Sequence, residues 1–213
     1  MADRESRKKR ITKRREEQIL KAASDVFTSR GYAAATIPEI ASSAGVAVGT
    51  IYNYYPSKRE LFIAVILKLI ITTPLLDLID RMPEENVAAT FRQIMQDRFS
   101  LIENEPISKI PSLMGEIIRD PELKRIWIEQ FIQPFFTRME KVYLRMTDSG
   151  KFRPVEPAIA TRLIGGMIFG FLMLKIMEGE ASPLNRMPDN KVADIVADFV
   201  GRGLMNTDIL PKG

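Results

Sequence analysis

The stretch from Thr36 to Phe62 constrains the fold most, because it contains two short helical patterns joined at a glycine. Thr36 stands three residues before Glu39, the spacing of a capping box that opens a helix. Gly45 marks the turn after that helix, where positive φ costs little only for glycine. Two short helices around such a turn predict a helix-turn-helix, the motif that places its second helix in the major groove of DNA. The buried side of the first helix is predicted to be Ile37, Ile40, Ala41 and Ala44.

The second helix of this pair is predicted from about Val48 to Tyr54, with Val46, Ile51 and Tyr55 as its core anchors. Its other side chains differ from those of an ordinary surface helix, which favours Glu, Lys and Gln. They suit a DNA groove, because hydroxyls and amides reach phosphates or base edges and glycine lets the backbone approach. The candidate DNA-binding residues on this helix are Gly49, Thr50, Tyr52, Asn53 and Tyr54.

A further helix is predicted to begin after Pro56, with Ser57 as its N-cap and Glu60 three residues later. Free backbone amides at a helix start attract phosphate, and Lys58 adds a positive charge beside them. Ser57 and Lys58 are therefore candidates for a phosphate clamp. A capped surface helix without any ligand is the alternative explanation of the same residues.

Positive charge is concentrated at the N-terminal end of the chain. Residues 1–60 contain 12 Lys and Arg against 7 Asp and Glu, whereas residues 61–213 contain 19 against 20. Within residues 1–15 eight basic residues stand against only Asp3 and Glu5. A basic head on a nearly neutral body indicates a polyanionic partner. A disordered tail that only improves solubility is the alternative.

Helical periodicity runs through the whole chain and no convincing strand pattern occurs, which predicts an all-α fold. The first helix is expected at about 12–30, with Gly31 just beyond its end. Breaks at Pro- and Gly-containing segments separate the later candidate helices, which span about 57–80, 85–103, 107–118, 121–148, 156–178 and 189–206.

Two apolar runs, Phe62–Leu76 and Leu163–Leu174, invite comparison with membrane helices. A membrane-spanning helix needs about 20 predominantly apolar residues. The first run is interrupted by Lys68 and Pro74, and the second is only 12 residues long. Both runs are therefore predicted to be buried helices, and neither a signal peptide nor a membrane span is expected.

The motifs of the N-terminal part together resemble the TetR family of bacterial regulators over about 50 residues. The resemblance implies a three-helix DNA-binding unit followed by a larger helical bundle that binds a ligand and dimerises. It also implies that six positions face operator DNA, namely Thr36, Gly49, Thr50, Tyr52, Tyr54 and Lys58. The motifs that carry it are Phe27-x-x-x-Gly31-Tyr32, Thr36-x-x-x-Ile40-Ala41, Ala44-Gly45-Val46, Gly49-Thr50-x-Tyr52-x-Tyr54-Tyr55 and Lys58-x-x-Leu61.

One position departs from the family pattern. The residue before the second helix of the motif is commonly Ser in this family, where it caps the helix and binds phosphate, and here it is Ala47. Losing such a cap costs about 1 kcal/mol of local helix stability. The basic N-terminal arm is predicted to replace the missing phosphate contact.

The predicted domains are a basic arm with a helix-turn-helix at 1–60 and a helical effector-binding and dimerisation domain at 61–213. Ten of the 11 methionines lie beyond residue 80, together with many of the aromatic residues. Methionine adapts to irregular shapes and favours promiscuous apolar sites. Packed core is the alternative role for each of these side chains. The candidate ligand-binding residues are Met95, Phe99, Met114, Trp127, Phe131, Phe135, Phe169 and Met173.

Glycines in the run Leu163–Leu174 suggest an interface between helices. Gly165, Gly166 and Gly170 each weaken an isolated helix by up to about 1 kcal/mol, so close approach of another helix is a reason for their presence. By the family resemblance, a homodimer is expected through the helices near 156–178 and 189–206. A helix buried within one chain is the alternative.

The residue types present exclude several kinds of chemistry. The chain contains neither Cys nor His, which removes disulfides, thiolate nucleophiles, Cys/His zinc sites and Ser-His-Asp hydrolysis. No catalytic residue, metal site or cofactor is predicted. The expected function is a cytoplasmic transcriptional repressor that releases a palindromic operator when a small, largely apolar ligand binds. An activator or a regulator controlled by a protein partner is the alternative, followed by a basic membrane-surface protein.

Overall fold

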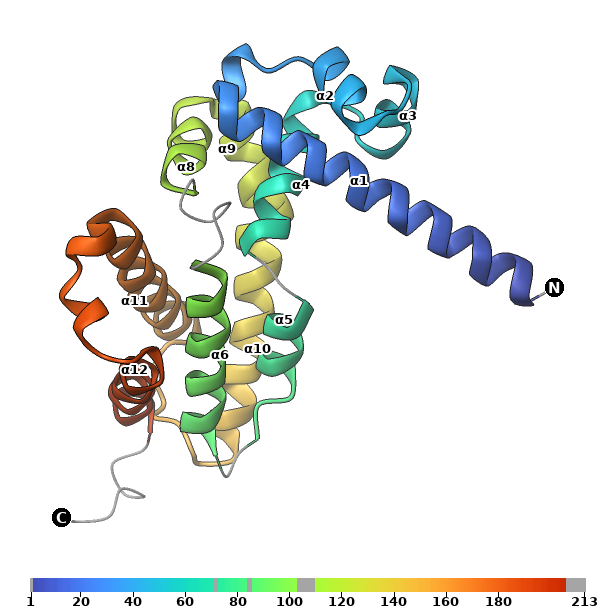
Figure 1. The fold of residues 1–213 in the computed structure, drawn as a ribbon. Helices are drawn as coiled ribbons and strands as arrows, with labels where there is room; N and C mark the ends of the chain where they lie inside the picture. The colour runs from blue at the N-terminus through green and yellow to red at the C-terminus, as the bar shows by residue number, and fades with distance from the viewer. Residues whose placement is uncertain (1, 71–72, 84–85, 103–109, 206–213) are drawn as a thin grey trace. The chain divides into compact units, whose positions relative to one another are not determined.

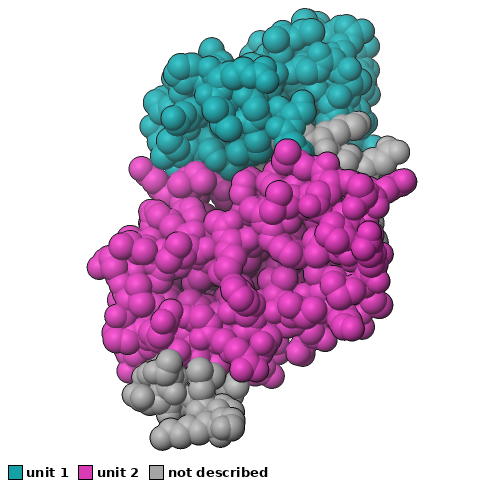
Figure 2. Space-filling view, turned by 90° about the vertical axis from the view of Figure 1, so that its left-hand side faces the viewer, with its two compact units in different colours: residues 1–70, 109–129 teal, residues 71–108, 130–213 magenta. Residues whose placement is uncertain are grey.

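The computed structural model describes residues 2–70, 73–83, 86–102 and 110–205, which form two compact units. One unit consists of residues 1–70 and 109–129, and the other of residues 71–108 and 130–213 (Figure 2). Over the described residues the regular elements are helices, and the one isolated bridge joins Phe152 to Met205 (Figure 1). The all-α prediction is confirmed. The packing boundary does not coincide with the predicted division at residue 60, which separates the chain by role and stays a prediction.

The first unit combines the predicted helix-turn-helix with two helices from the middle of the chain. Its helices are α1 (Ala2–Ala34), α2 (Ile37–Ala44), α3 (Val48–Tyr54), α4 (Lys58–Ile70), α8 (Ile110–Arg119) and α9 (Pro121–Trp127). Within it α1 packs against α2 and α4, α2 against α3, and α4 against α9. Segments more than 50 residues apart in the sequence therefore share one core.

The helix α1 (Ala2–Ala34) begins earlier than the predicted span 12–30. It begins at Ala2, because the Lys, Arg and Glu residues of the N-terminal segment are good helix formers. It continues past Gly31, whose φ of 76° and ψ of 162° break the helical geometry, and ends at Ala34. The helical geometry therefore breaks at Gly31, as predicted, and a short second helical segment follows up to Ala34. The basic segment belongs to the helix and is not a separate tail.

Local sequence signals explain the helix-turn-helix. Both hydrogen bonds of the capping box at Thr36 and Glu39 are present, and the predicted apolar stripe of α2 is buried. Gly45 has φ 63° and ψ 37°, the left-handed conformation predicted for the turn. The stripe of α1 is buried at Ile19, Ala22, Ala23 and Phe27, whereas Val26 is only half-buried.

The described part of the second unit packs two apolar clusters between its helices. These helices are α5 (Thr73–Asp80), α6 (Val87–Ile102), α10 (Gln133–Asp148), α11 (Pro157–Glu178) and α12 (Asp189–Leu204), with the short 3₁₀ segments η2 (Gly179–Ala181) and η3 (Pro183–Arg186) before α12. The helix α12 packs along α6, and α10 packs against α11 and α5. The larger cluster includes Phe91, Tyr143, Met146 and Val200.

Two stretches that were each predicted to be one helix contain more than one helical element. The predicted helix 57–80 corresponds to α4, which ends at Ile70, and α5, which begins at Thr73 with Pro74 in its first turn, and residues 71–72 lie outside the described part of the chain. The predicted helix 121–148 is interrupted by the π-helical segment η1 (Ile128–Ile132). Pro134 lacks an N–H and its ring clashes with the carbonyl four residues earlier, so regular α-helical bonding cannot continue through this point.

The prediction that Leu163–Leu174 is a buried helix is wrong. In α11 Leu163, Met167, Phe169 and Leu174 are between 42% and 65% exposed. The segment Pro157–Ala181 is the one described helix that is long and apolar enough to cross a membrane by length and composition, and only 28% of its apolar window is buried. Exposed apolar helices of this kind also form subunit interfaces.

Candidate nucleic-acid interface

The short helix α3 is anchored by one face and leaves the other open to solvent. Ile51 is fully buried and Tyr55, just after the helix, is 9% exposed. Tyr52 is 48% exposed, and Gly49 and Asn53 are also exposed, whereas Thr50 and Tyr54 are half-buried. Residues on one side of a helix recur every three to four positions. Because Ile51 faces the core, its neighbours Gly49, Tyr52 and Asn53 lie on the side of α3 that faces solvent.

The N-terminus of α3 has no side-chain cap. Ala47 occupies the N-cap position with φ −70° and ψ 149°, and no side-chain hydrogen bond is made there. The capping serine that is common in the family is therefore replaced by a residue that cannot cap α3. The Thr50 N–H donates to the Ala47 carbonyl at 2.9 Å, and the N–H groups before it at a helix start have no partner within the helix, so they are suited to a phosphate or water.

Tyrosine hydroxyls connect the end of α3 to α1. The Tyr54 hydroxyl donates to the Thr12 carbonyl oxygen at 3.4 Å, and the Tyr55 hydroxyl donates to Glu16 Oε1 at 3.2 Å. Burial of the Tyr55 ring, together with the nearby Glu16 carboxylate, raises the pKa of its hydroxyl. These contacts fix α3 against the helix that carries the basic segment.

The side chain of Thr36 serves the cap of α2. Its hydroxyl accepts from the Glu39 N–H at 3.3 Å and donates to Glu39 Oε2 at 3.0 Å. The Thr36 hydroxyl, the Thr36 backbone N–H and the neighbouring Arg30 together lower the pKa of the Glu39 carboxyl. Arg30 also forms an ion pair with Glu39, so this corner is held by charge as well as by the cap.

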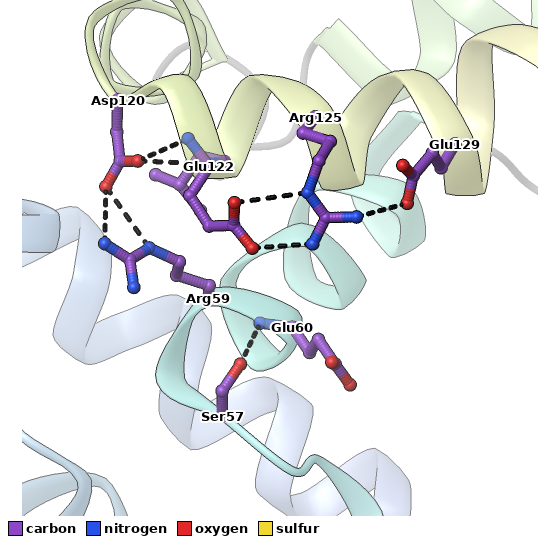
Figure 3. Close-up of polar contacts among 8 residues, drawn as sticks. Ser57, Arg59, Glu60, Asp120, Glu122, Arg125 and Glu129 are labelled. Carbon is purple, nitrogen blue, oxygen red and sulfur yellow. Dashed lines mark hydrogen bonds and ion pairs between the residues drawn. The ribbon is translucent and has the colours of Figure 1, made fainter.

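Ser57 and Lys58 lie where α4 begins, but they differ in what they contact. Ser57 Oγ accepts from the Glu60 N–H at 3.1 Å, as predicted for an N-cap (Figure 3). Lys58 Nζ donates to the Ala33 carbonyl at 3.4 Å and lies 4.5 Å from the centroid of the Tyr32 ring. Burial lowers the pKa of this ammonium group. Lys58 thus contacts Ala33 and Tyr32 of α1, and the sequence around Lys58 gave no sign of these contacts.

The predicted DNA-binding residues therefore come from three adjoining segments of one unit. Thr36 lies at the start of α2, and Ser57 and Lys58 lie at the start of α4. The five on α3 are Gly49, Thr50, Tyr52, Asn53 and Tyr54. Sequence reasoning missed Gln18, whose side-chain amide donates to the Ala44 carbonyl at 2.7 Å and so ties α1 to the turn. It also missed Tyr32 beneath Lys58.

The predicted ligand-binding residues do not form one group. Met114 and Trp127 belong to the first unit, and the other six belong to the second. Met95 and Phe99 are almost fully buried in the smaller apolar cluster of the second unit, and Phe135 packs against the larger one. Phe131 and Met173 are half-buried and Phe169 is 43% exposed.

A buried lysine beside Phe99 was not predicted. Lys175 is 8% exposed, its Nζ lies 4.5 Å from the Phe99 ring centroid, and it donates to Asp189 Oδ1 at 2.8 Å. The Asp189 carboxylate lies at the start of α12, where the helix dipole favours negative charge. Among the described residues no group of three or more acidic side chains could hold a metal ion.

A short helix that is anchored on one side, uncapped, and exposed at polar and glycine positions after a tight turn defines a helix-turn-helix DNA-binding protein. The comparisons give the family. The description "Bacterial regulatory proteins, tetR family" matches residues 19–65, and "AefR-like transcriptional repressor, C-terminal domain" matches residues 85–202, which is more than half of the chain. The chain belongs to the TetR family of bacterial transcriptional regulators.

Individual relatives agree with this assignment. The chain is 51% identical over 49 residues to the HTH-type transcriptional activator FasR of Mycolicibacterium smegmatis, a match that covers 23% of this chain and 22% of that relative. It is 26% identical over 158 residues to the fatty acid metabolism regulator protein of Bacillus subtilis, covering 72% and 77% of the two chains. Among solved structures, the complex of SmeT with triclosan has a TM-score of 0.67 at 24% identity, covering 93% and 95%. SmeT is the repressor of a multidrug efflux pump of Stenotrophomonas maltophilia.

Removal of the basic segment tests its part in DNA binding. Deleting residues 2–10 is expected to weaken operator binding and to make its dependence on salt shallower, because each lost phosphate contact reduces the slope of log K against log salt by about 1. A variant with Gln at Arg4, Arg7, Lys8, Lys9 and Arg10 keeps the length and removes the charge. Both are measured by fluorescence anisotropy at several salt concentrations. Unchanged affinity and slope in both variants would identify the segment as a passive extension.

Gly49 allows a test that separates stability from DNA binding. A Cβ at this position meets no atom within 4 Å, and φ is not positive there. Gly49→Ala is therefore expected to stabilise the protein by up to about 1 kcal/mol. The same methyl group is expected to weaken operator binding, because it occupies the space that the DNA backbone needs. Denaturant unfolding and anisotropy measure the two effects, and Gly115→Ala on α8 is the control. Operator affinity equal to that of the unaltered protein would contradict the assigned role.

Proposed function

We propose that this regulator is a homodimeric repressor that releases a palindromic operator when a small, largely apolar ligand binds its C-terminal domain. The observation that carries the proposal is the exposed face of α3, where Tyr52, Gly49 and Asn53 surround a buried Ile51. The likeness of residues 85–202 to the AefR-like repressor domain supports repression as the outcome. The bacterial cytoplasm, where the chromosome lies, is the proposed location.

The eight proposed DNA contacts divide by their chemistry. The side chains of Thr50, Tyr52, Asn53 and Tyr54 offer hydroxyl and amide groups that suit base edges as well as phosphates, and Gly49 provides room for the backbone. Thr36, Ser57 and Lys58 flank them at two helix starts, where N–H groups favour phosphate. Binding by Lys58 requires that its ammonium group leave the Tyr32 ring or share its charge between ring and phosphate.

The proposed dimer uses the apolar surface of α11 and α12. Many of its large apolar side chains are exposed to solvent, a costly arrangement that association would relieve. A Cβ at Gly166 or Gly170 meets no atom within 4 Å, so both glycines leave room for another helix, whereas a Cβ at Gly165 would lie only 3.2 Å from the Phe136 ring of the same chain. The exposed side chains are Ile159, Leu163, Met167, Phe169, Leu174, Met177, Ile195 and Phe199.

The proposed ligand site lies in the second unit near Met95 and Phe99. Met95 and Phe99 lie in a buried apolar cluster, against which the partly buried Phe171 and Leu172 pack. A site lined by such side chains would favour an apolar ligand. SmeT in complex with triclosan and the FadR protein of B. subtilis in complex with stearoyl-CoA have similar folds. Release of DNA requires that the ligand favour a conformation in which the two heads no longer match the operator spacing.

An activator is the second candidate, because the head is 51% identical to that of an activator over 49 residues. Selection of bound sequences from random duplex DNA tests the main proposal. The expected product is a palindrome whose half-sites lie about 34–36 Å apart, one turn of the double helix. Titration of apolar compounds against that complex is then expected to release the DNA. Sequence-indifferent binding would contradict the proposal, and stimulation of transcription from a promoter carrying the operator would favour the activator.

A further inference from the structure

The two central helices α4 and α9 are joined by an ion pair next to the proposed phosphate contacts. Arg59 lies one residue after Lys58 in the first turn of α4, and Asp120 immediately precedes α9 (Figure 3). Arg59 Nε and Nη2 both donate to Asp120 Oδ2 at 3.3 Å. Both residues belong to the first unit, so this contact lies within one compact body.

Asp120 uses its two oxygens for different purposes. Oδ1 accepts from the backbone N–H groups of Glu122 and Leu123 at 2.9 and 3.1 Å and so caps α9, while Oδ2 receives Arg59. The backbone hydrogen bonds, first that of Leu123, together with the Arg59 charge, lower the pKa of this carboxyl. The hydrogen bonds to the start of α9 therefore hold the Asp120 side chain in place independently of its contact with Arg59.

The rest of α9 is also firmly placed. Leu123, Ile126 and Trp127 are buried, and α9 packs against α4. On its exposed side Arg125 bridges Glu122 and Glu129 without reaching α4 (Figure 3). A rigid α9 with a fixed carboxylate is therefore able to hold the first turn of α4 in one orientation.

The same corner contains the groups that surround Lys58. The Tyr32 ring lies beneath the Lys58 ammonium, and the charges of Arg59 and Asp120 act on the Tyr32 hydroxyl, whose pKa is raised mainly by burial. A displacement of Asp120 relative to α4 thus affects Arg59 directly and the Tyr32–Lys58 pair beside it. The first turn of α4 is where Ser57 and Lys58 are proposed to meet phosphate.

We infer that Arg59 and Asp120 are positioning residues for DNA binding: α9, which lies in the part of the chain matched by the repressor-type C-terminal domain, holds the first turn of α4 in its DNA-binding orientation. The inference rests on the proposed function.

Paired substitutions test this inference on the full-length protein. Asp120→Asn keeps an oxygen that can cap α9 but removes the charge that holds Arg59, and Arg59→Gln removes the other partner. Each single substitution is expected to weaken binding to the selected duplex about threefold to tenfold. The double variant is expected to lose no more affinity than the single variant with the larger loss, because both substitutions break the same ion pair. Arg125→Gln breaks charge pairs on the same helix and is expected to leave affinity unchanged. Circular dichroism and thermal unfolding check folding, with Asp120→Ser as a second capped variant.

The outcomes distinguish positioning from direct contact. If Arg59→Gln weakens binding and flattens the salt slope by about 1 while Asp120→Asn leaves binding unchanged or tightens it, Arg59 itself binds phosphate and the inference is wrong. Unchanged affinity in both single variants, or additive losses in the double variant, would also overturn it. If the unaltered protein binds no duplex, the proposed function fails, and the inference fails with it.

Discussion

Replacing Tyr52 by alanine is expected to weaken operator binding about 10- to 100-fold and to leave the protein folded and dimeric. Tyr52 is 48% exposed on α3, so its loss removes little from the core. The neighbouring Ile51, which is fully buried, continues to hold the helix. Anisotropy with the selected palindrome measures affinity, and sedimentation velocity measures the oligomeric state.

Matched substitutions make the Tyr52 result specific. Tyr52→Phe removes only the hydroxyl, so its comparison with alanine separates hydrogen bonding from ring contact. Ile118→Ala alters a side chain on α8 that is 73% exposed and lies outside the predicted interface, and it is expected to leave binding unchanged. Loss of the dimer in Tyr52→Ala would show that α3 has been assigned the wrong role, and unchanged affinity would remove Tyr52 from the DNA contacts.

Introducing a charge at Phe199 is expected to separate the proposed dimer into monomers. Phe199 on α12 is 70% exposed in the single chain, so glutamate there does little to the fold of the monomer. In an interface the same carboxylate would be buried without a partner. Phe199→Glu is expected to raise the dimer dissociation constant by about 30-fold or more, the effect typical of a central interface residue. Sedimentation equilibrium measures this constant.

Operator binding follows from the oligomeric state. A monomer contacts one half-site, so Phe199→Glu is also expected to lose most of its affinity for the palindrome at concentrations where it is monomeric. Ile118→Glu places the same charge on an equally exposed apolar position of the other unit and is expected to change neither property. A dimer of undiminished stability in Phe199→Glu would exclude this part of α12 from the interface.

The sequence allowed the helix-turn-helix to be located almost to the residue. The capping box at Thr36, the left-handed glycine at 45 and the uncapped start at Ala47 are local features, each decided by a few neighbouring residues. The apolar spacing of α2 likewise predicted its buried side. Such signals need no knowledge of distant partners, because they depend on backbone geometry and hydrogen bonding within one or two helical turns.

The sequence was less informative about features that depend on which helices pack together. Leu163–Leu174 was predicted to be buried because it is apolar, yet α11 exposes much of its surface within the chain. Lys58 was predicted to take part in a phosphate clamp, which stays a prediction, and its contact with Tyr32 could not be predicted because it depends on the packing of α1 against α4. The candidate ligand residues fall into two units, since spacing along the chain says little about which helix faces meet.

By itself the sequence determined the helical fold and the helix-turn-helix, because these depend on short-range capping, turns and periodicity, and its motifs carried the resemblance to the TetR family. Only the tertiary structure decided that residues 109–129 join the DNA-binding unit, and that Arg59 meets Asp120 across 61 positions of the chain. Contacts at that separation arise when nonlocal apolar faces are buried together, and no local pattern encodes which faces those are.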